Sequence, residues 1–198
     1  PAEVPLVSHD QVIQEKILQG LSFQDVGLTI PKTKTYLKHD LLFTHFGLSG
    51  PLALRASTYV LEVLQTDEVC PIKIDFLPEI NHEEVMRMLK SGEKLPLPER
   101  LLKYLQSQSQ NNELLLQNIK AFKMNIHETR GWRHAFLTNG GVEVKEVNPK
   151  TMQSKKDLSI YFCGEVLDYH AFTGGFNLTC AFSTGYTAGY FAAKNCSS

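Results

Sequence analysis

Apolar and polar residues alternate in two stretches of the first eighty residues, and this pattern predicts β-strands at 26–30 and 72–76. A period of two turns one side of a strand toward a core and the other toward solvent. Residues 37–43 are predicted to form another strand, which runs into a glycine-punctuated turn at 44–51. The first part of the chain is therefore expected to be rich in β-structure.

Helical periodicity is found elsewhere along the chain. Apolar spacing predicts a short amphipathic helix at 9–19 and a longer one at 53–64. Residues 81–124 carry a capping-box pattern and several apolar stripes at helical spacing, which indicate a small helical insertion with its own core. A further helix rich in small residues is predicted at 178–193, where those residues would allow close packing.

The end of the chain combines an apolar run at 158–163 with two acids and a double glycine. The run predicts a buried parallel strand, in which Cys163 would be buried. An acid that follows such a strand can bind a ribose or ribitol hydroxyl, so Glu165 and Asp168 are candidates for that role.

The double glycine Gly174-Gly175 comes just before the predicted last helix. A helix start offers unpaired N–H groups and the positive end of the helix dipole. Two glycines would let a flat ring approach it closely, and a flavin that becomes anionic on reduction would be stabilised there. The alternative is that Gly174-Gly175 is a plain turn and that Asn177 is only a helix cap.

Three segments together resemble a known family: 42–51 (LFTHFGLSGP), 138–155 with its Thr-Asn-Gly-Gly-Val sequence, and 164–189. The chain resembles bacterial flavoproteins of the YhiN/BaiN type, which are FAD-dependent members of the two-dinucleotide-binding-domain superfamily. The order and spacing of the segments match along essentially the whole chain.

The resemblance implies an α+β fold in which a β-rich, barrel-like inserted domain carries a small helical insertion. Residues 1–80 and 125–150 would form the β-rich domain, 81–124 the helical domain, and 151–198 the C-terminal strand and helix of a Rossmann-like FAD domain. The implied cofactor-binding residues are Gly164, Glu165 and Asp168, along the ribityl-pyrophosphate part of FAD, and Thr173, Gly174, Gly175, Phe176, Asn177 and Leu178.

Proteins of this family carry a Gly-x-Gly-x-x-Gly turn in the first half of their sequence, and this chain does not contain it. We therefore expect a fragment that binds FAD poorly by itself and is inactive alone. The intact protein is expected to be an FAD-dependent oxidoreductase acting on an unidentified small organic substrate, with NAD(P)H as a candidate electron donor. The alternative is a non-catalytic substrate cap or interaction domain that does not bind FAD on its own.

A formal charge of −1 argues against nucleic-acid and anionic-membrane partners. We therefore expect neither, although a flavin-dependent RNA modifier is a third hypothesis. The four cysteines and seven histidines lack metal-ligand spacing, so we expect no metal and a cytoplasmic protein with free thiols. No catalytic residue is identified, and the oligomeric state stays open.

Two further residues have alternative interpretations. His45 could donate a hydrogen bond to a substrate or flavin, or could satisfy a backbone group within its turn. Trp132 is expected to lie in a core or a domain interface and not to act as a stacking platform.

Overall fold

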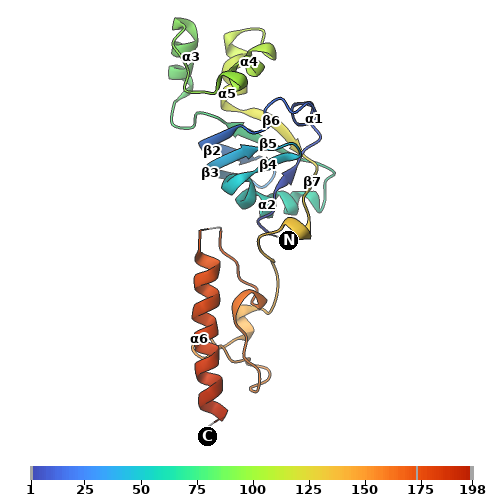
Figure 1. The fold of residues 1–198 in the computed structure, drawn as a ribbon, viewed down its shortest axis with the longest axis vertical. Helices are drawn as coiled ribbons and strands as arrows, with labels where there is room; N and C mark the ends of the chain where they lie inside the picture. The colour runs from blue at the N-terminus through green and yellow to red at the C-terminus, as the bar shows by residue number, and fades with distance from the viewer. Residues whose placement is uncertain (1, 173, 197–198) are drawn as a thin grey trace. The chain divides into compact units, whose positions relative to one another are not determined.

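The computed structural model describes residues 2–172 and 174–196. The chain divides into two compact units (Figure 1). One unit comprises Val4–His134, and the other comprises the residues before Val4 together with the chain from Ala135 onward. The mixed α+β class predicted from the sequence is confirmed.

A seven-stranded antiparallel sheet forms the centre of the Val4–His134 unit. The strands lie in the order β6-β5-β2-β3-β4-β1-β7. Their bounds are β1 Leu6–Val7, β2 Ser22–Ile30, β3 Thr35–Phe43, β4 Gly47–Ser49, β5 Cys70–Asp75, β6 Phe122–Ile126 and β7 Glu128–Thr129. All three predicted strands are present. Leu28, Ile30, Ile72 and Ile74 are fully or almost fully buried on the inner face of the sheet.

The two edge strands of this sheet are neighbours in sequence. β6 ends at Ile126 and β7 begins at Glu128, so His127 alone joins the first strand of the order to the last. Because one extended residue spans only about 3.5 Å, the two edges must approach each other. The sheet therefore curls toward a barrel, as the barrel-like prediction requires.

Helix α2 (Gly50–Leu64) packs against strands β2 and β3 and supplies one wall of the core. Pro51 stands in its first turn, where the missing N–H would have had no partner within the helix. Its inner residues Leu52, Ala56 and Val60 are completely buried. Rings of Phe23, Phe43, Phe76 and Phe122 contact one another in the same core.

Three helices lie together at one end of the sheet: α3 (His82–Ser91), α4 (Glu99–Ser107) and α5 (Asn112–Lys120) (Figure 1). The side chains of Asn81 and Asn111 accept hydrogen bonds from the backbone N–H groups three residues later, which satisfies helix starts that have no internal partner. Lys120, at the end of α5, ties this group to the sheet. Its buried ammonium donates to the carbonyl oxygens of Leu77 and Ile80 and lies 2.8 Å from the Asp75 carboxylate.

The helix predicted at 9–19 is much shorter. Helix α1 covers only Gln11–Gln14, and the chain continues in turns to Gly20. Lys16 has a φ of +57°, which an α-helix does not accommodate. Ile13 and Leu18 are nevertheless buried. The apolar pattern therefore predicted the buried residues correctly and the length of the helix incorrectly.

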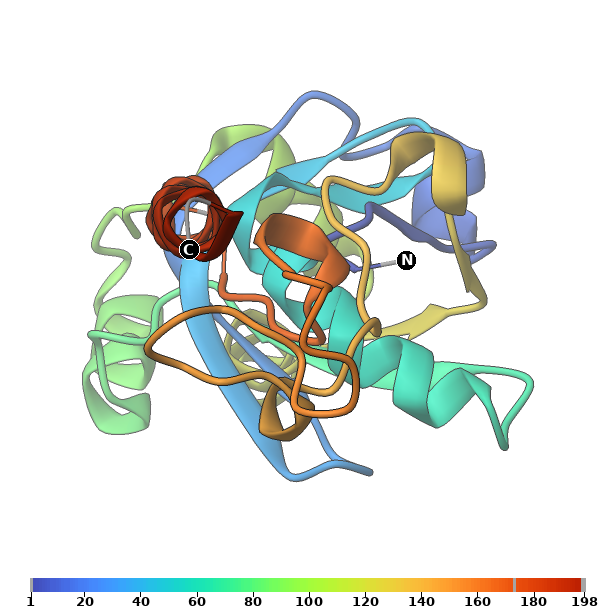
Figure 2. The ribbon, with the colours of Figure 1, turned by 90° about the horizontal axis from the view of Figure 1, so that it is seen from below.

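Helix α6 (Phe176–Cys196) includes the last predicted helix, but the buried strand predicted at 158–163 is wrong. Figure 2 shows the stretch before α6 as loops with short helical turns, among them η2 (Val144–Glu146) and η3 (Gly164–Val166). The only pairing in this run is a single bridge between Gln153 and Tyr161. Leu158 is 68% exposed and Cys163 is also exposed, because among the described residues no strand lies on either side to cover them. The predicted close packing of α6 through Gly185 and Gly189 is also not seen, since no atom of another element lies within 4 Å of a Cβ built at either glycine.

We predict that Lys120→Met destabilises the Val4–His134 unit. The substitution leaves the Asp75 carboxylate and two carbonyl groups without their cation, and loss of one partner of a buried pair costs about 3 kcal/mol. Urea unfolding followed by circular dichroism measures the change. Lys123→Met on the exposed side of β6 is the matched control, and equal unfolding free energies for the two variants would refute the role of Lys120.

The four thiols are expected to differ sharply in reactivity. Burial raises the pKa of the Cys70 thiol to about 11. At about pH 8 only about one Cys70 in a thousand would be the reactive thiolate. Iodoacetamide should therefore alkylate the exposed Cys163 and Cys196 in the native protein and reach Cys70 only after denaturation, as peptide mass spectrometry would show. Native-state alkylation of Cys70 at the rate of Cys163 would contradict the burial.

Candidate functional site at the start of helix α6

The loop before helix α6 is held in place by Asn177. Its side-chain oxygen accepts a hydrogen bond from the Ala171 N–H at 2.8 Å, and its nitrogen donates to the Ala171 carbonyl at 2.6 Å. Gly174 and Gly175 have φ values of +142° and +91°, which residues with a side chain rarely adopt. The glycines thus allow the turn into the helix, while Asn177 closes the loop above it.

The segment that faces this loop includes a close backbone crossing at Gly141. A Cβ at Gly141 would lie 2.3 Å from the Val166 carbonyl oxygen, so only glycine fits there. The crossing lets the Val142 N–H donate to Val166 and the Asp168 N–H donate to Val142, both at 2.8 Å. The Glu165 carboxylate accepts a hydrogen bond from the Thr138 N–H. These contacts join residues 138–142 to 164–168.

Helix α6 also contacts the η3 turn directly. The Gly164 N–H donates to the Thr184 hydroxyl at 2.9 Å, and a Cβ at Gly164 would lie 3.8 Å from that of Ala181. Gly164 has a φ of +69°, so it too occupies a backbone conformation that favours glycine. The η3 turn therefore packs along the first turns of α6.

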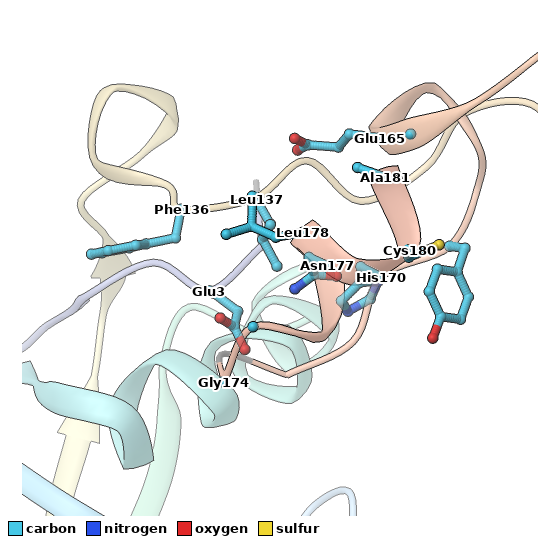
Figure 3. A pocket seen from close by; sticks show the side chains of 13 residues that line it. Glu3, Phe136, Leu137, Glu165, His170, Gly174, Asn177, Leu178, Cys180 and Ala181 are labelled. Atoms are coloured by element: carbon cyan, nitrogen blue, oxygen red, sulfur yellow. The ribbon is translucent and has the colours of Figure 1, made fainter. Parts of the chain in front are cut away.

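These segments enclose a pocket of about 380 Å³, all of it within the smaller unit. Figure 3 shows the pocket with Phe136 and Leu137 on one segment and the start of α6 on another. The lining residues are Glu3, Phe136, Leu137, Gly164, Glu165, Tyr169, His170, Gly174, Gly175, Asn177, Leu178, Cys180 and Ala181. The volume is at the lower end of the roughly 300–1,000 Å³ typical of small-molecule sites, which suits one ring system better than a whole dinucleotide.

Most of the predicted site residues meet at this pocket. Those that line it are Gly164, Glu165, Gly174, Gly175, Asn177 and Leu178. Asp168 and Phe176 are exposed and lie outside the lining. Thr173 lies outside the described residues.

Several lining residues carried no signal in the sequence. Phe136 and Leu137 reach the pocket because their backbone pairs with Ala2 and Glu3, through the Leu137–Ala2 bridge and the bond from the Phe136 N–H to the Glu3 carbonyl. Partners so far apart in the chain cannot be read from local periodicity. His170 and Cys180 also line the pocket.

The other motifs are distributed differently. His45 is exposed in the Thr44–Gly47 turn of the larger unit. Trp132 is 66% exposed, so the core position is wrong, and the domain-interface alternative stays a prediction. Across residues 2–172 and 174–196, no three His, Cys, Asp or Glu side chains gather in a way that could hold a metal ion. No helix in those ranges has the length and apolar character to span a membrane.

The fold and the site define a barrel-like α+β domain joined to a smaller unit with a glycine-lined pocket at a helix start. Residues 1–137 match the family model described as the HI0933-like protein barrel and H2TH domain. The chain belongs to this family, and the resemblance to YhiN/BaiN-type flavoproteins is confirmed.

Three curated relatives show how the match extends. A ribosomal RNA dihydrouridine synthase of Escherichia coli is 29% identical over 92% of this chain and 49% of its own length. A ribosomal RNA dihydrouridine synthase of Haemophilus influenzae is 33% identical over 94% of this chain and 50% of its own length. A 3-dehydro-bile acid delta(4,6)-reductase of Clostridium scindens is 28% identical over 78% of this chain and 44% of its own length. The chain thus spans about half the length of the curated relatives that it matches.

The relatives correct one expectation from the sequence. The near-neutral charge predicted that no nucleic acid is a partner, but two relatives that match more than nine tenths of the chain are named for ribosomal RNA. Net charge is a sum over the chain and does not report where cations gather. The exclusion of nucleic acid is therefore wrong.

We predict that Gly141→Ala opens the crossing between residues 138–142 and 164–168. A Cβ would clash with the Val166 carbonyl, and the φ of +153° adds strain of about 1–3 kcal/mol. Hydrogen exchange at the Val142 and Asp168 amides should accelerate strongly. Gly140→Ala is the control, since its φ is also positive but no atom lies within 4 Å of its Cβ position. Unchanged protection in Gly141→Ala would refute the crossing.

Proposed function

We propose that this chain contributes the substrate-binding domain and one part of the cofactor site of an FAD-dependent reductase. The observation that carries the proposal is the pocket at the start of α6, where Gly174 and Gly175 leave the helix terminus open to a ligand. Residues 151–198 would belong to the FAD-binding domain. Residues 1–80 and 125–150 would form the β-rich domain, and residues 81–124 the helical domain.

The residues present fit a flavin ring. A Cβ at Gly175 would meet no atom within 4 Å, so a flat ring has room beside this backbone. The neighbouring Leu178 and Leu137 offer apolar surface for its faces. The start of a 21-residue helix favours the negative charge that a flavin gains on reduction.

Each of the candidate residues has a distinct part in the proposal. Gly174 and Gly175 would admit the isoalloxazine, Asn177 would hold the loop beside it, and Gly164 would approach the ribityl-pyrophosphate part. Glu165 anchors the 138–142 segment through Thr138 and keeps a second carboxylate oxygen for a cofactor hydroxyl. We assign Asp168 and Phe176 to the outer rim of the same site, and Thr173, which lies outside the described residues, keeps the cofactor-binding role that the family resemblance implies. When bound, the flavin would supply the hydride.

The aromatic side of α6 supports membership of a larger domain. Phe182, Tyr186 and Tyr190 follow one another at intervals of four residues and are 76%, 78% and 54% exposed. An apolar stripe of this kind normally packs against another element. We infer that the rest of an FAD-binding domain covers it.

The names of the relatives suggest the reaction. A dihydrouridine synthase adds hydrogen across a carbon–carbon double bond of uridine, and a delta(4,6)-reductase acts on double bonds of a bile acid. In both substrates the double bond is conjugated to a carbonyl group, which makes the alkene a hydride acceptor. We propose that the protein reduces such a bond, with NAD(P)H as the electron donor.

Uridine in RNA is the substrate that we propose first, because the two relatives named for ribosomal RNA match more than nine tenths of the chain. A small organic molecule with a conjugated carbonyl is the second candidate, which the bile acid reductase supports. A substrate cap that binds no flavin would be a non-catalytic alternative.

We predict that Gly174→Leu abolishes flavin binding. A leucine at a φ of +142° strains the turn and fills the space beside the helix start. FAD is titrated into the 198-residue chain and into a polypeptide of the relatives' length that contains it, and quenching of flavin fluorescence is recorded. Tight binding is expected in the longer polypeptide and weak binding in the chain alone.

Gly92→Leu is the matched control. Gly92 also has a positive φ, of +73°, and no atom lies within 4 Å of its Cβ position, but it belongs to the larger unit and does not line the pocket, so this variant should bind FAD like the unmodified protein. Normal flavin content in Gly174→Leu would move the site elsewhere. Absence of FAD binding in every form would favour the non-catalytic alternative.

A further inference from the structure

A rigid turn presents one aromatic side chain on the larger unit. The Thr44 hydroxyl accepts a hydrogen bond from the Gly47 N–H at 3.1 Å, and the Thr44 N–H donates to the Gly47 carbonyl at 2.8 Å. A Cβ at Gly47 would lie 2.2 Å from the Leu6 carbonyl oxygen, so the turn is pressed against β1. The turn carries His45 and Phe46, whose rings meet edge to face at 5.0 Å.

Arg130 follows β7, which pairs with β1, and its guanidinium stacks on the Phe46 ring of this turn. Its guanidinium carbon lies 4.4 Å from the centroid of the Phe46 ring. Its Nη2 lies 2.8 Å from His134 Nε2, while His134 Nδ1 lies 3.0 Å from the Arg130 carbonyl oxygen. Because a guanidinium only donates and a carbonyl only accepts, these contacts have Arg130 donating to Nε2 and Nδ1 donating to the Arg130 carbonyl. The Arg130 guanidinium is thus held between the Phe46 ring and the His134 ring.

The segment between these two residues is exposed. The 3-10 helix η1 (Trp132–His134) follows β7, and Trp132 is 66% exposed. Arg133 and His134 are exposed as well. We call His45, Phe46, Arg130, Trp132, Arg133 and His134 the arginine–aromatic surface. It includes two arginines and no carboxylate, and the one acid of β7, Glu128, lies 3.8 Å from His9.

We propose that the arginine–aromatic surface binds single-stranded RNA, with an unpaired base stacked on Trp132 and phosphates held by Arg133 and Arg130. The proposal rests on the proposed function for its substrate class and names the part of the chain that holds that substrate. Sequence-specific recognition of RNA uses unpaired bases stacked on aromatic rings or arginine planes. A bile acid has one carboxylate, which a single arginine can pair, and no aromatic ring to stack, so two arginines beside exposed aromatic rings favour RNA over the second candidate substrate.

Another group of cations in the larger unit, Lys32 and Lys38, is less suited to RNA. Lys38 and Lys32 are paired with Glu79 and Asp67, so their charges are already compensated. The carboxylates beside these two lysines would repel a phosphate. Lys32 and Lys38 are therefore less suited than the arginine–aromatic surface to bind RNA.

We predict that Trp132→Ala raises the dissociation constant for RNA about tenfold, because each stacked base contributes about 1–3 kcal/mol. The probe is a fluorescein-labelled RNA hairpin with a uridine-containing loop, added to the flavin-free 198-residue chain and followed by fluorescence anisotropy. Arg133→Ala should weaken binding and lower the slope of log affinity against log salt by about one. Arg130→Lys should weaken binding while keeping the charge, because lysine lacks the planar stack.

Tyr36→Ala and Lys123→Ala are the matched controls. Tyr36 is 56% exposed and Lys123 is exposed, and both lie on strands away from the arginine–aromatic surface. Both variants should bind RNA like the unmodified chain. Loss of binding in these controls with normal binding in Trp132→Ala and Arg133→Ala would overturn the proposal, as would the absence of RNA binding by the unmodified chain.

Two further outcomes separate this proposal from others. Polyglutamate that competes as well as RNA, with no effect of Trp132→Ala, would mean general anion binding and would overturn it. Because flavin is left out, RNA binding through Trp132 in a protein that fails to bind FAD would sink the proposed function alone. FAD binding with an RNA affinity that is indifferent to all three variants would sink this inference alone.

Discussion

The single-residue connection at His127 is the constraint on which the larger unit depends. β6 and β7 are the two edges of the sheet, and one residue cannot span a flat seven-stranded sheet, whose neighbouring strands lie about 4.8 Å apart. The sheet must curl, and its inner face then encloses the core that α2 completes. The same connection places β7 beside β1, and thereby brings Arg130 to the turn that carries Phe46.

Local signals in the sequence were sufficient for elements that are stabilised locally. Alternation located β2 and β5, and the capping-box pattern with the apolar stripes located the helical group α3, α4 and α5. The apolar run at 158–163 failed because a buried strand is defined by its neighbours, and in the described part of the chain Gln153 alone pairs with it, at Tyr161. The helix at 9–19 failed because Lys16 takes a left-handed conformation that periodicity does not report.

Part of the candidate site could also be predicted from local signals in the sequence. Gly174 and Gly175 could be chosen from their place before a predicted helix, where a tight turn needs a positive φ, and Gly164 was indicated by the family resemblance. The opposite wall could not, because Leu137 reaches the pocket by pairing with Ala2 at the other end of the chain. The arginine–aromatic surface was missed for a related reason: the net charge averages Arg130 and Arg133 with distant acids, and Phe46 joins them only through the fold.

The pairing of β1 with β7 has a consequence for how the two units are connected. Leu6 lies opposite Thr129, and the Arg130 N–H donates to the Pro5 carbonyl, so the chain enters and leaves the larger unit at adjacent points. Ala2 and Leu137 are likewise paired within the smaller unit. A domain whose two ends are neighbours can be accepted by a surface loop of another domain with little disturbance. The larger unit thus has the geometry of a cassette, which could be exchanged among relatives without rebuilding the pocket at the start of α6.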